Sequence, residues 1–384
     1  MNRIRHFSVL ILLVLVGCQP SEEPVDAPTR VVEAGEIVPV PTEARFFSVR
    51  DVVLSGDDLW VLEGASPFVT RVSLASGEAV RFGGEGEGPA ELRNPWGIQA
   101  LGEPGASGVR IWDLGNGRVS TFDSTGGFLG SERLSTRGIV RARNDIREVS
   151  YADPFRIRAG PSGVLVGVFP GRVNRTPDLS GGSLWRADAQ LEPGLEMTRF
   201  GEHASSGSDG LREWASVPLW DACGGSVVLW SPEAASVIWL DQEGRVVQTV
   251  PVRVDRTPLA LEDIERYLRQ MSRLELGPDH EAAGINFASV ARAMRGEFAE
   301  DRPFATDLRC EEGDAAWIRL FDTSVDPLGR SRSWLRVSPD TSPRQVSFPG
   351  GFTPAVFTSH RVYGLLEFPN GDQRLAWWRE VSVD

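Results

Sequence analysis

The stretch from Val109 to Leu129, VRIWDLGNGRVSTFDSTGGFL, contains two short β-rich segments separated by a polar turn. The first segment ends at Asp113, and the second ends at Asp123 ahead of a turn that closes on Gly126. Aspartate at the start of a turn and glycine at its end suit the geometry of tight β-turns. The stretch therefore predicts two antiparallel strands, followed by a further strand after the second turn.

The same strand–turn–strand unit recurs six times along the chain. Successive copies lie roughly 45 to 60 residues apart, with one gap of about ninety residues between the fourth and the fifth. Each copy has an apolar strand before it and a shorter strand after it, which is typical of four-stranded propeller blades. The strand pairs are predicted at residues 59–63 and 69–74, 109–113 and 118–123, 164–169 and 183–188, 227–231 and 236–241, 316–322 and 333–338, and 362–367 and 374–380. The sequence thus predicts an all-β fold, a six-bladed β-propeller.

The first and last parts of the repeat region predict how the ring closes, and the long gap between the fourth and fifth copies predicts an insertion. The sixth copy stops before a fourth strand, and residues 30–40, RVVEAGEIVPV, have the composition of a strand. We expect this N-terminal strand to close the ring, because closure also hides an open sheet edge. The gap at about residues 257–300 has helical periodicity, and Thr257 and Pro258 suit the first positions of a helix. We expect a helical hairpin inserted between blades 4 and 5.

A glycine-rich segment, FGGEGEGPAELRNPWGI at residues 82–98, precedes the stretch quoted first. Together the two segments resemble bacterial six-bladed β-propeller lipoproteins, a family with NHL-like repeats. The resemblance rests on Gly84, Gly86, Gly88, Pro89, Glu91, Leu92 and Pro95, and then on Asp113, Asn116, Arg118, Val119, Phe122, Asp123 and Gly126. It implies the propeller fold and little about activity, because propellers carry many functions.

The first 17 residues have the features of an export signal. Arg3 and Arg5 precede the apolar run Phe7–Val16, which is too short to span a bilayer as a helix. The run leads to Gly17 and Cys18, a pattern that resembles a bacterial lipobox and makes Cys18 the predicted lipidation site. The alternative is an ordinary signal peptide with an incidental cysteine. The predicted organisation is a lipoprotein signal peptide at 1–17, a flexible tether at 18–29 and the propeller at 30–384.

Lipidation at Cys18 makes the membrane the first predicted partner. Two or three acyl chains on one residue anchor a protein stably. Gln19 follows the cysteine, which favours sorting to the outer membrane. We therefore expect a lipid-anchored protein of the bacterial cell envelope that faces the periplasm or the surface.

Composition excludes several chemistries. The 384 residues include 40 lysines and arginines, and all 40 are arginine, so no P-loop lysine or Schiff base is available. The 53 acids give a formal net charge of −13, which argues against a nucleic-acid partner.

With Cys18 acylated, Cys223 and Cys310 remain, and an even pair in an exported protein predicts one disulfide. Two buried free thiols are the alternative.

Two candidate sites follow from polar residues. Six-bladed propeller hydrolases bind a divalent ion on the channel axis, and calcium prefers oxygen ligands. The candidates here are Glu63, Asp113, Asn116, Asp221 and Asp322, although Asp113 and Asn116 are equally explained as turn residues. No cofactor is predicted firmly, and calcium is the one considered.

The second candidate is an arginine cluster between blades 2 and 3, which is locally positive although the protein as a whole has a negative net charge. Guanidinium groups suit carboxylates and phosphates, so these side chains are candidate contacts for an anionic ligand or partner. The alternative is a solvated loop paired with nearby acids. The cluster consists of Arg133, Arg137, Arg141, Arg143 and Arg147, and the last four are the candidate contacts.

The sequence favours a non-enzymatic binding or scaffold module whose propeller face meets an envelope protein or small molecule. The alternative is a metal-assisted hydrolase or lactonase with axial carboxylates.

Overall fold

The structure is a computed structural model, and it is built almost entirely from short antiparallel strands. It describes residues 31–32, 35–101, 108–134, 154–160, 163–168, 172–173, 176–177, 183–199, 206–207, 210–211, 214, 216–276, 284–313, 315–324, 330–368 and 371–380. The predicted signal peptide, Cys18 and tether lie outside these residues. Within them, no helix is long and apolar enough to cross a membrane.

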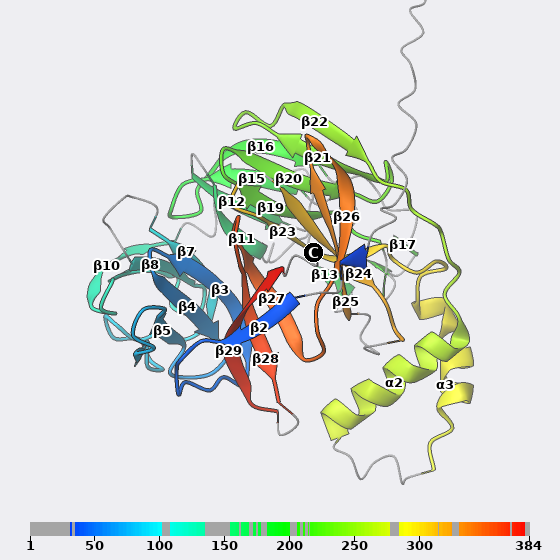
Figure 1. Ribbon diagram of the computed structural model, residues 1–384, viewed down its shortest axis with the longest axis horizontal. Helices are drawn as coiled ribbons and strands as arrows, with labels where there is room; N and C mark the ends of the chain where they lie inside the picture. Colours follow the sequence, from blue (N-terminus) through cyan, green and yellow to red (C-terminus); the bar gives the residue numbers. More distant parts are fainter. Residues whose placement is uncertain are drawn as a thin grey trace, which may run out of the picture.

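Six sheets of four main strands stand in a ring, and this confirms the predicted six-bladed propeller (Figure 1). Blade 1 is β3 (Val49–Ser55), β4 (Asp58–Glu63), β5 (Val69–Ser73) and β6 (Ala79–Phe82); blade 2 is β7 (Pro95–Ala100), β8 (Gly108–Asp113), β9 (Arg118–Asp123) and β10 (Phe128–Arg133). Blade 3 is β11 (Pro154–Gly160), β12 (Gly163–Val168), β15 (Ser183–Ala187) and β16 (Pro193–Arg199); blade 4 is β19 (Leu219–Cys223), β20 (Ser226–Ser231), β21 (Ser236–Leu240) and β22 (Val246–Pro251). Blade 5 is β23 (Ala305–Cys310), β24 (Ala316–Phe321), β25 (Arg330–Ser338) and β26 (Thr341–Ser347); blade 6 is β27 (Phe352–Phe357), β28 (Val362–Glu367), β29 (Gln373–Glu380) and β2 (Gly35–Pro39).

The ring is closed by the N-terminal strand, as the sequence predicts. β2 pairs antiparallel with β29 and becomes the outer strand of blade 6. β1 (Val31–Val32) adds a short parallel strand to the outer edge of blade 5. The first strands of the blades contact one another in the order β3, β7, β11, β19, β23, β27 and back to β3, so they surround the axis.

The core lies between neighbouring blades, where the apolar faces of the sheets pack together. Between blades 1 and 2, Trp60 and Phe122 are fully buried, and Phe82 lies against both rings at 5.8 and 4.9 Å between centroids. Between blades 5 and 6, Trp317 stacks on Phe357 at 4.7 Å. The aromatic side chains of the repeat therefore pack in the core between neighbouring blades.

The turns of the repeat use the predicted residues. The carboxylate of Asp123 accepts hydrogen bonds from the backbone N–H of Thr125 and Gly127, and Gly126 has a φ of +84°. Asp241 caps the matching turn of blade 4, where Gly244 has a φ of +79°. Glycine is favoured there because other residues rarely adopt that conformation.

Because consecutive strands in each blade are antiparallel, the connections alternate between two faces of the ring. We call the face that carries the second-to-third strand turns and the links between blades the loop face. The opposite face carries the first-to-second and third-to-fourth turns, and we call it the turn face. The loop face holds the larger additions, namely the hairpins β13–β14 (Arg172–Val173, Thr176–Pro177) and β17–β18 (Ser206–Gly207, Gly210–Leu211) and the helical insert.

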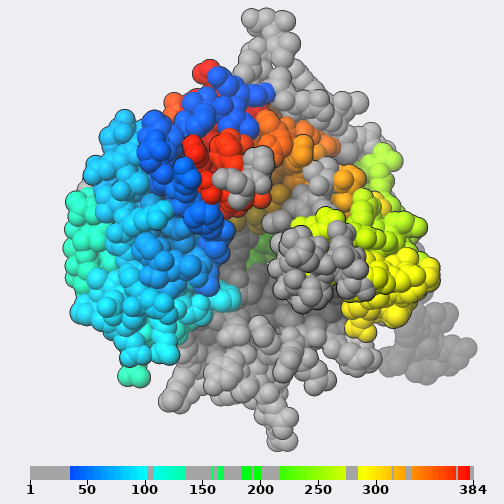
Figure 2. Space-filling model, turned by 90° about the horizontal axis from the view of Figure 1, so that it is seen from below, coloured from blue at the N-terminus to red at the C-terminus, as the bar shows by residue number. Residues whose placement is uncertain are grey.

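The helical insert joins blade 4 to blade 5 and consists of α2 (Leu261–Leu276) and α3 (Phe287–Ala293). α2 begins later than the sequence predicts, because Pro258 forms a β-bridge with Asp301 instead of a first helical turn. The insert has its own small core around Ile264 and Phe298. It forms a yellow lobe across the molecule from the blue and cyan first blades (Figure 2).

Candidate functional site

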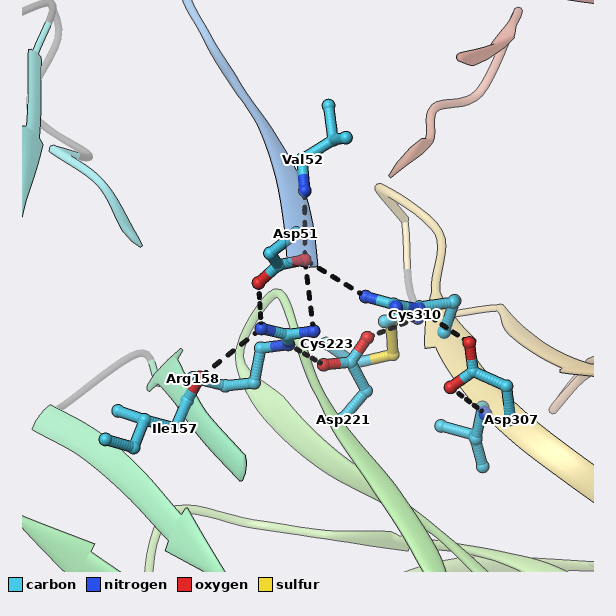
Figure 3. A network of polar contacts seen from close by, with 10 residues as sticks. Asp51, Val52, Ile157, Arg158, Asp221, Cys223, Asp307 and Cys310 are labelled. Atoms are coloured by element: carbon cyan, nitrogen blue, oxygen red, sulfur yellow. Dashed lines mark hydrogen bonds and ion pairs between the residues drawn. A yellow bond between two sulfur atoms is a disulfide. The ribbon is translucent and has the colours of Figure 1, made fainter. Parts of the chain in front are cut away.

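The centre of the ring is occupied by charged side chains from the first strands of several blades. Asp51 from β3, Arg158 from β11 and Asp221 from β19 converge there (Figure 3). The guanidinium of Arg158 donates to both carboxylates, with Nε 3.2 Å from Oδ1 of Asp221. Because β7 lies between β3 and β11 in the ring, the contact between Arg158 and Asp51 joins two blades that are not neighbours. The channel is therefore bridged by an ion-pair network at this level.

A second arginine reaches the same carboxylate from the opposite side. Arg309 of β23 places Nη1 3.5 Å from Oδ1 of Asp51 and Nε 3.0 Å from Oδ2 of Asp307. Burial alone lowers the pKa of the Arg309 guanidinium, but the carboxylates of Asp307, Asp51 and Asp221 raise that pKa well above its ordinary value. Arg309 therefore stays protonated, and each axial carboxylate faces a fixed positive charge. We call Asp51, Arg158, Asp221, Asp307 and Arg309 the axial network.

A disulfide between Cys223 and Cys310 lies beside the axial network, with a Cα–Cα distance of 5.2 Å. It joins the ends of β19 and β23, the first strands of blades 4 and 5. The backbone N–H of Cys310 donates to Oδ2 of Asp221 at 2.9 Å. The covalent link and the axial ion pairs therefore hold the first strands of blades 4 and 5, the two blades that the helical insert joins.

The structure does not bring the five predicted calcium ligands together. Of these, only Asp221 belongs to the axial network, where Arg158 pairs with it. Asp322 accepts from the backbone N–H and hydroxyl of Ser324. Glu63 ends the second strand of blade 1 and accepts from Thr70.

Asp113 and Asn116 hold the glycine-rich connection in place. The Asp113 carboxylate accepts from the backbone N–H of Arg93 and Asn94, and Asn116 Nδ2 donates to the Gly86 carbonyl at 2.8 Å. Arg118 donates to the carbonyls of Gly88 and Glu91. The polar residues of the second motif thus fix the backbone of the first motif, which is a structural reason for the two to occur together. The side chains of Asp113 and Asn116 therefore bond to the backbone of this connection and do not converge on a shared ion. The polar residues that fix this segment and their partners are Asp113, Asn116, Arg118, Gly86, Gly88, Glu91, Arg93 and Asn94.

The carboxyl of Glu63 has a perturbed pKa. Burial raises the pKa of Glu63, while the Thr70 hydrogen bond and the charge of Arg81 partly oppose the rise. A lone carboxyl with one hydroxyl partner does not form a metal centre. Among the described residues, no group of three or more histidine, cysteine or acidic side chains is placed to hold a metal ion.

The predicted anion contacts Arg137, Arg141, Arg143 and Arg147 lie outside the described residues. Sequence reasoning did not single out Asp51, Arg158 or Arg309. Their one sequence signal is that each is a charged residue inside the first strand of a blade, as in VRDVVLS at β3. Local sequence does not reveal the pairing, because the partners are 107 and 258 residues apart.

The insert is tied to blade 5 by a buried carboxylate. Asp263 of α2 is fully buried and accepts from Arg302 at 2.7 Å and from the Thr323 hydroxyl at 2.6 Å. Burial alone raises the pKa of this carboxyl, but its hydrogen bonds with Thr323, Arg302 and the Ala260 backbone hold the pKa below its usual range. Thr323 lies in the loop-face turn that follows β24. The insert is therefore fixed against the loop face.

Large apolar side chains are exposed on the loop face. Phe47 is 71% exposed in the connection before β3, and Trp96 is 40% exposed at the start of β7, the neighbouring first strand. Leu261 and Ile285 are exposed in the insert. The other exposed large apolar residues among those described, Leu129, Val246 and Val247, lie on the outermost strands β10 and β22.

No family model and no curated protein matches this chain. Solved structures resemble it at low identity. An exported protein from Bacteroides fragilis matches with 10% identity and a TM-score of 0.52 over 93% of this chain and 98% of its own. A member of the DUF4221 family from Bacteroides vulgatus matches with 10% identity and a TM-score of 0.49 over 91% and 99%. The calcium-binding protein regucalcin from Agrobacterium tumefaciens matches with 12% identity and a TM-score of 0.44 over 92% and 96%. At these identities, what the chain shares with the first of them is the fold alone.

Proposed function

We propose that this chain is a lipid-anchored, extracytoplasmic binding module, similar to the NHL-like propeller lipoproteins, whose loop face binds an envelope protein. The observation that carries the proposal is the exposure of Phe47, Trp96, Leu261 and Ile285 on that face. Exposed aromatic and aliphatic side chains are the typical anchors of protein interfaces. The larger additions to the ring lie on the same face, where loops commonly carry binding function.

The axial network supports a binding role over the hydrolase alternative. A divalent ion on the axis needs several carboxylates with free lone pairs. Here Asp51 is shared by two guanidinium groups and Asp221 by Arg158 and the Cys310 backbone. A cation would have to displace those fixed positive charges, so this arrangement stabilises the ring rather than a metal.

The test is site-specific photo-crosslinking in the native envelope, with p-benzoylphenylalanine introduced into the full chain. Phe47 and Ile285 are the probe positions, because both are exposed on the loop face. Val247 on β22 and Arg245 in a turn-face turn are the control positions, because both side chains are well exposed. Discrete adducts from the two loop-face positions alone are expected.

Adducts of equal yield from Arg245 and Val247, or none from Phe47 and Ile285, would contradict the proposed face. The anchor is tested separately by Cys18→Ser, which should move the protein from the membrane fraction to the soluble fraction. Retention of Cys18→Ser in the membrane fraction after a carbonate wash would contradict lipid anchoring.

A further inference from the structure

A groove opens where the outer strand of blade 4 faces the turn between β25 and β26 of blade 5 (Figure 1). Its volume is about 440 Å³, and residues 248–251 of β22 line one side. Residues 338–343, which form the turn and the start of β26, line the other side. Only Asp340 among the lining residues is charged, so the groove suits a segment of chain with no net charge.

Both sides of the groove have backbone groups that pair with no strand in the described part of the chain. The Val252 N–H donates to the Ala235 carbonyl at 2.8 Å, so the alternation of the antiparallel ladder turns the N–H and C=O of Thr249 away from β21. β1 pairs only with Gln345 and Val346, so the outer edge of β26 before these residues is open as well. An extended segment in the groove therefore meets backbone donors and acceptors.

β22 lacks the protection that the other outer strands have. Exposed sheet edges are usually protected by charged side chains or by a covering strand. The outer strands β6, β10, β16 and β2 each carry at least one charged residue, and β26 is partly covered by β1. β22 has the sequence VVQTVP and carries none. Its uncharged edge is therefore suited to a covering segment.

The N-terminal part of the chain arrives at this groove. β1 is parallel to β26, with Val31 opposite Gln345, so the chain enters β1 from the end of β26 that borders the groove. Residues 24–30, PVDAPTR, come directly before the described residues and contain one acid and one arginine. This segment thus has no net charge, and its prolines favour an extended conformation.

We propose that residues 24–30 of this chain occupy the groove as an extended segment and hold the turn face toward the membrane. Prolines lack an N–H but keep their carbonyls, which suits a groove whose side-chain donors include Gln248, Thr249 and Ser342. The proposal rests on the lipid anchor proposed above.

Docking of this segment shortens the reach of the anchor. An undocked chain from Cys18 to Val31 spans up to about 45 Å, whereas the six residues 18–23 span only about 20 Å. The turn between β25 and β26 lies on the turn face, so a docked segment keeps that face near the lipid. The loop face then points away from the membrane, where an envelope protein has access to it.

The test of docking is electron paramagnetic resonance of the full lipidated chain in vesicles of phosphatidylethanolamine and phosphatidylglycerol. A spin label on Ala27→Cys should give an immobilised spectrum. Ser342→Trp fills the groove from an exposed position and should make the label mobile. The matched control is Ser131→Trp on β10, also at an exposed position, which should leave the spectrum unchanged.

A mobile label on Ala27→Cys without the tryptophan would overturn the proposal and leave the groove to an occupant from outside the chain. An immobilised spectrum that Ser342→Trp does not change would overturn it as well.

The orientation is tested in the same vesicles by fluorescence quenching with nitroxide-headgroup lipids. A bimane label on His360→Cys, in a turn-face turn, should be quenched more than one on Phe47→Cys on the loop face, and both positions are exposed. Equal quenching, or stronger quenching at position 47, would overturn the orientation. Failure of the lipid anchor is distinguishable, because the chain would then not float with the vesicles.

Discussion

Replacing Asp51 with asparagine removes the carboxylate that both axial arginines share. The structure predicts a large loss of stability, because Asp51 is buried and pairs with Arg158 and Arg309 from two different blades. The asparagine retains an oxygen for the Val52 N–H, which donates to Asp51 at 3.0 Å. The substitution therefore tests the charge and leaves the local backbone bond in place.

The expected cost is about 3–5 kcal/mol, the usual range when one partner of a buried ion pair is removed and the other is left uncompensated. For a cooperative unit of the predicted propeller's length, unfolding entropy is roughly 0.7 kcal/mol/K, so the melting temperature should fall by about 4–7 °C. The matched control is Glu36→Gln. Its pair with Arg379 is half-exposed on both sides, and its loss should cost less than about 1 kcal/mol.

The assay is thermal unfolding followed by circular dichroism in low and high salt. Salt should reduce the small effect of Glu36→Gln and leave the effect of Asp51→Asn largely unchanged, because buried pairs are poorly screened. A melting temperature for Asp51→Asn within about 1 °C of the wild-type chain would refute the view that the axial network holds the ring together.

Three further predictions concern the disulfide, the insert and a perturbed carboxyl. Reducing the disulfide between Cys223 and Cys310, which are 87 residues apart, should cost ~4 kcal/mol of stability and lower the melting temperature in dithiothreitol. An unchanged melting temperature would contradict the view that the disulfide stabilises the ring. Asp263→Asn should cost roughly 2 kcal/mol and speed hydrogen exchange in α2 but not in β4, whereas equal protection of α2 would contradict the anchoring role. Because burial raises the pKa of Glu63 above 4.5, the wild-type chain gains stability as pH falls through that raised pKa, and the gain is complete below about 4.5. Glu63→Gln should therefore be more stable than the wild-type chain at pH 7 and equal to it at pH 4; equal melting temperatures at both pH values would refute the shift.

The ring could be predicted from sequence because its signals are local. Asp123 and Gly126 mark one turn, and each turn of this kind needs only a few neighbouring residues. The closing strand also followed from local information, since residues 30–40 have strand composition and the sixth repeat lacks an outer strand. The start of α2 did not, because Pro258 pairs with Asp301 on the far side of the insert.

The centre of the ring could not be predicted, because its partners meet only after six blades have closed. Asp51 and Arg309 are 258 residues apart, and nothing near either residue in the sequence indicates this partner. Asp113 and Asn116 were candidate axial ligands because six-bladed propeller hydrolases bind a divalent ion through side-chain oxygens of this kind. In the folded chain those residues instead satisfy the backbone of the neighbouring connection, which is a local demand for hydrogen bonds.

The axial carboxylates hold the blades together through their ion pairs with arginine and are not available to a divalent cation. The most direct test is the melting temperature of the purified mature chain in calcium and in a chelator. An ion at a hundred times its Kd would stabilise the fold by about 2.7 kcal/mol, or about 4 °C here. The axial network predicts equal melting temperatures in both conditions, and a calcium-dependent rise of that size, lost in Asp221→Asn, would contradict it.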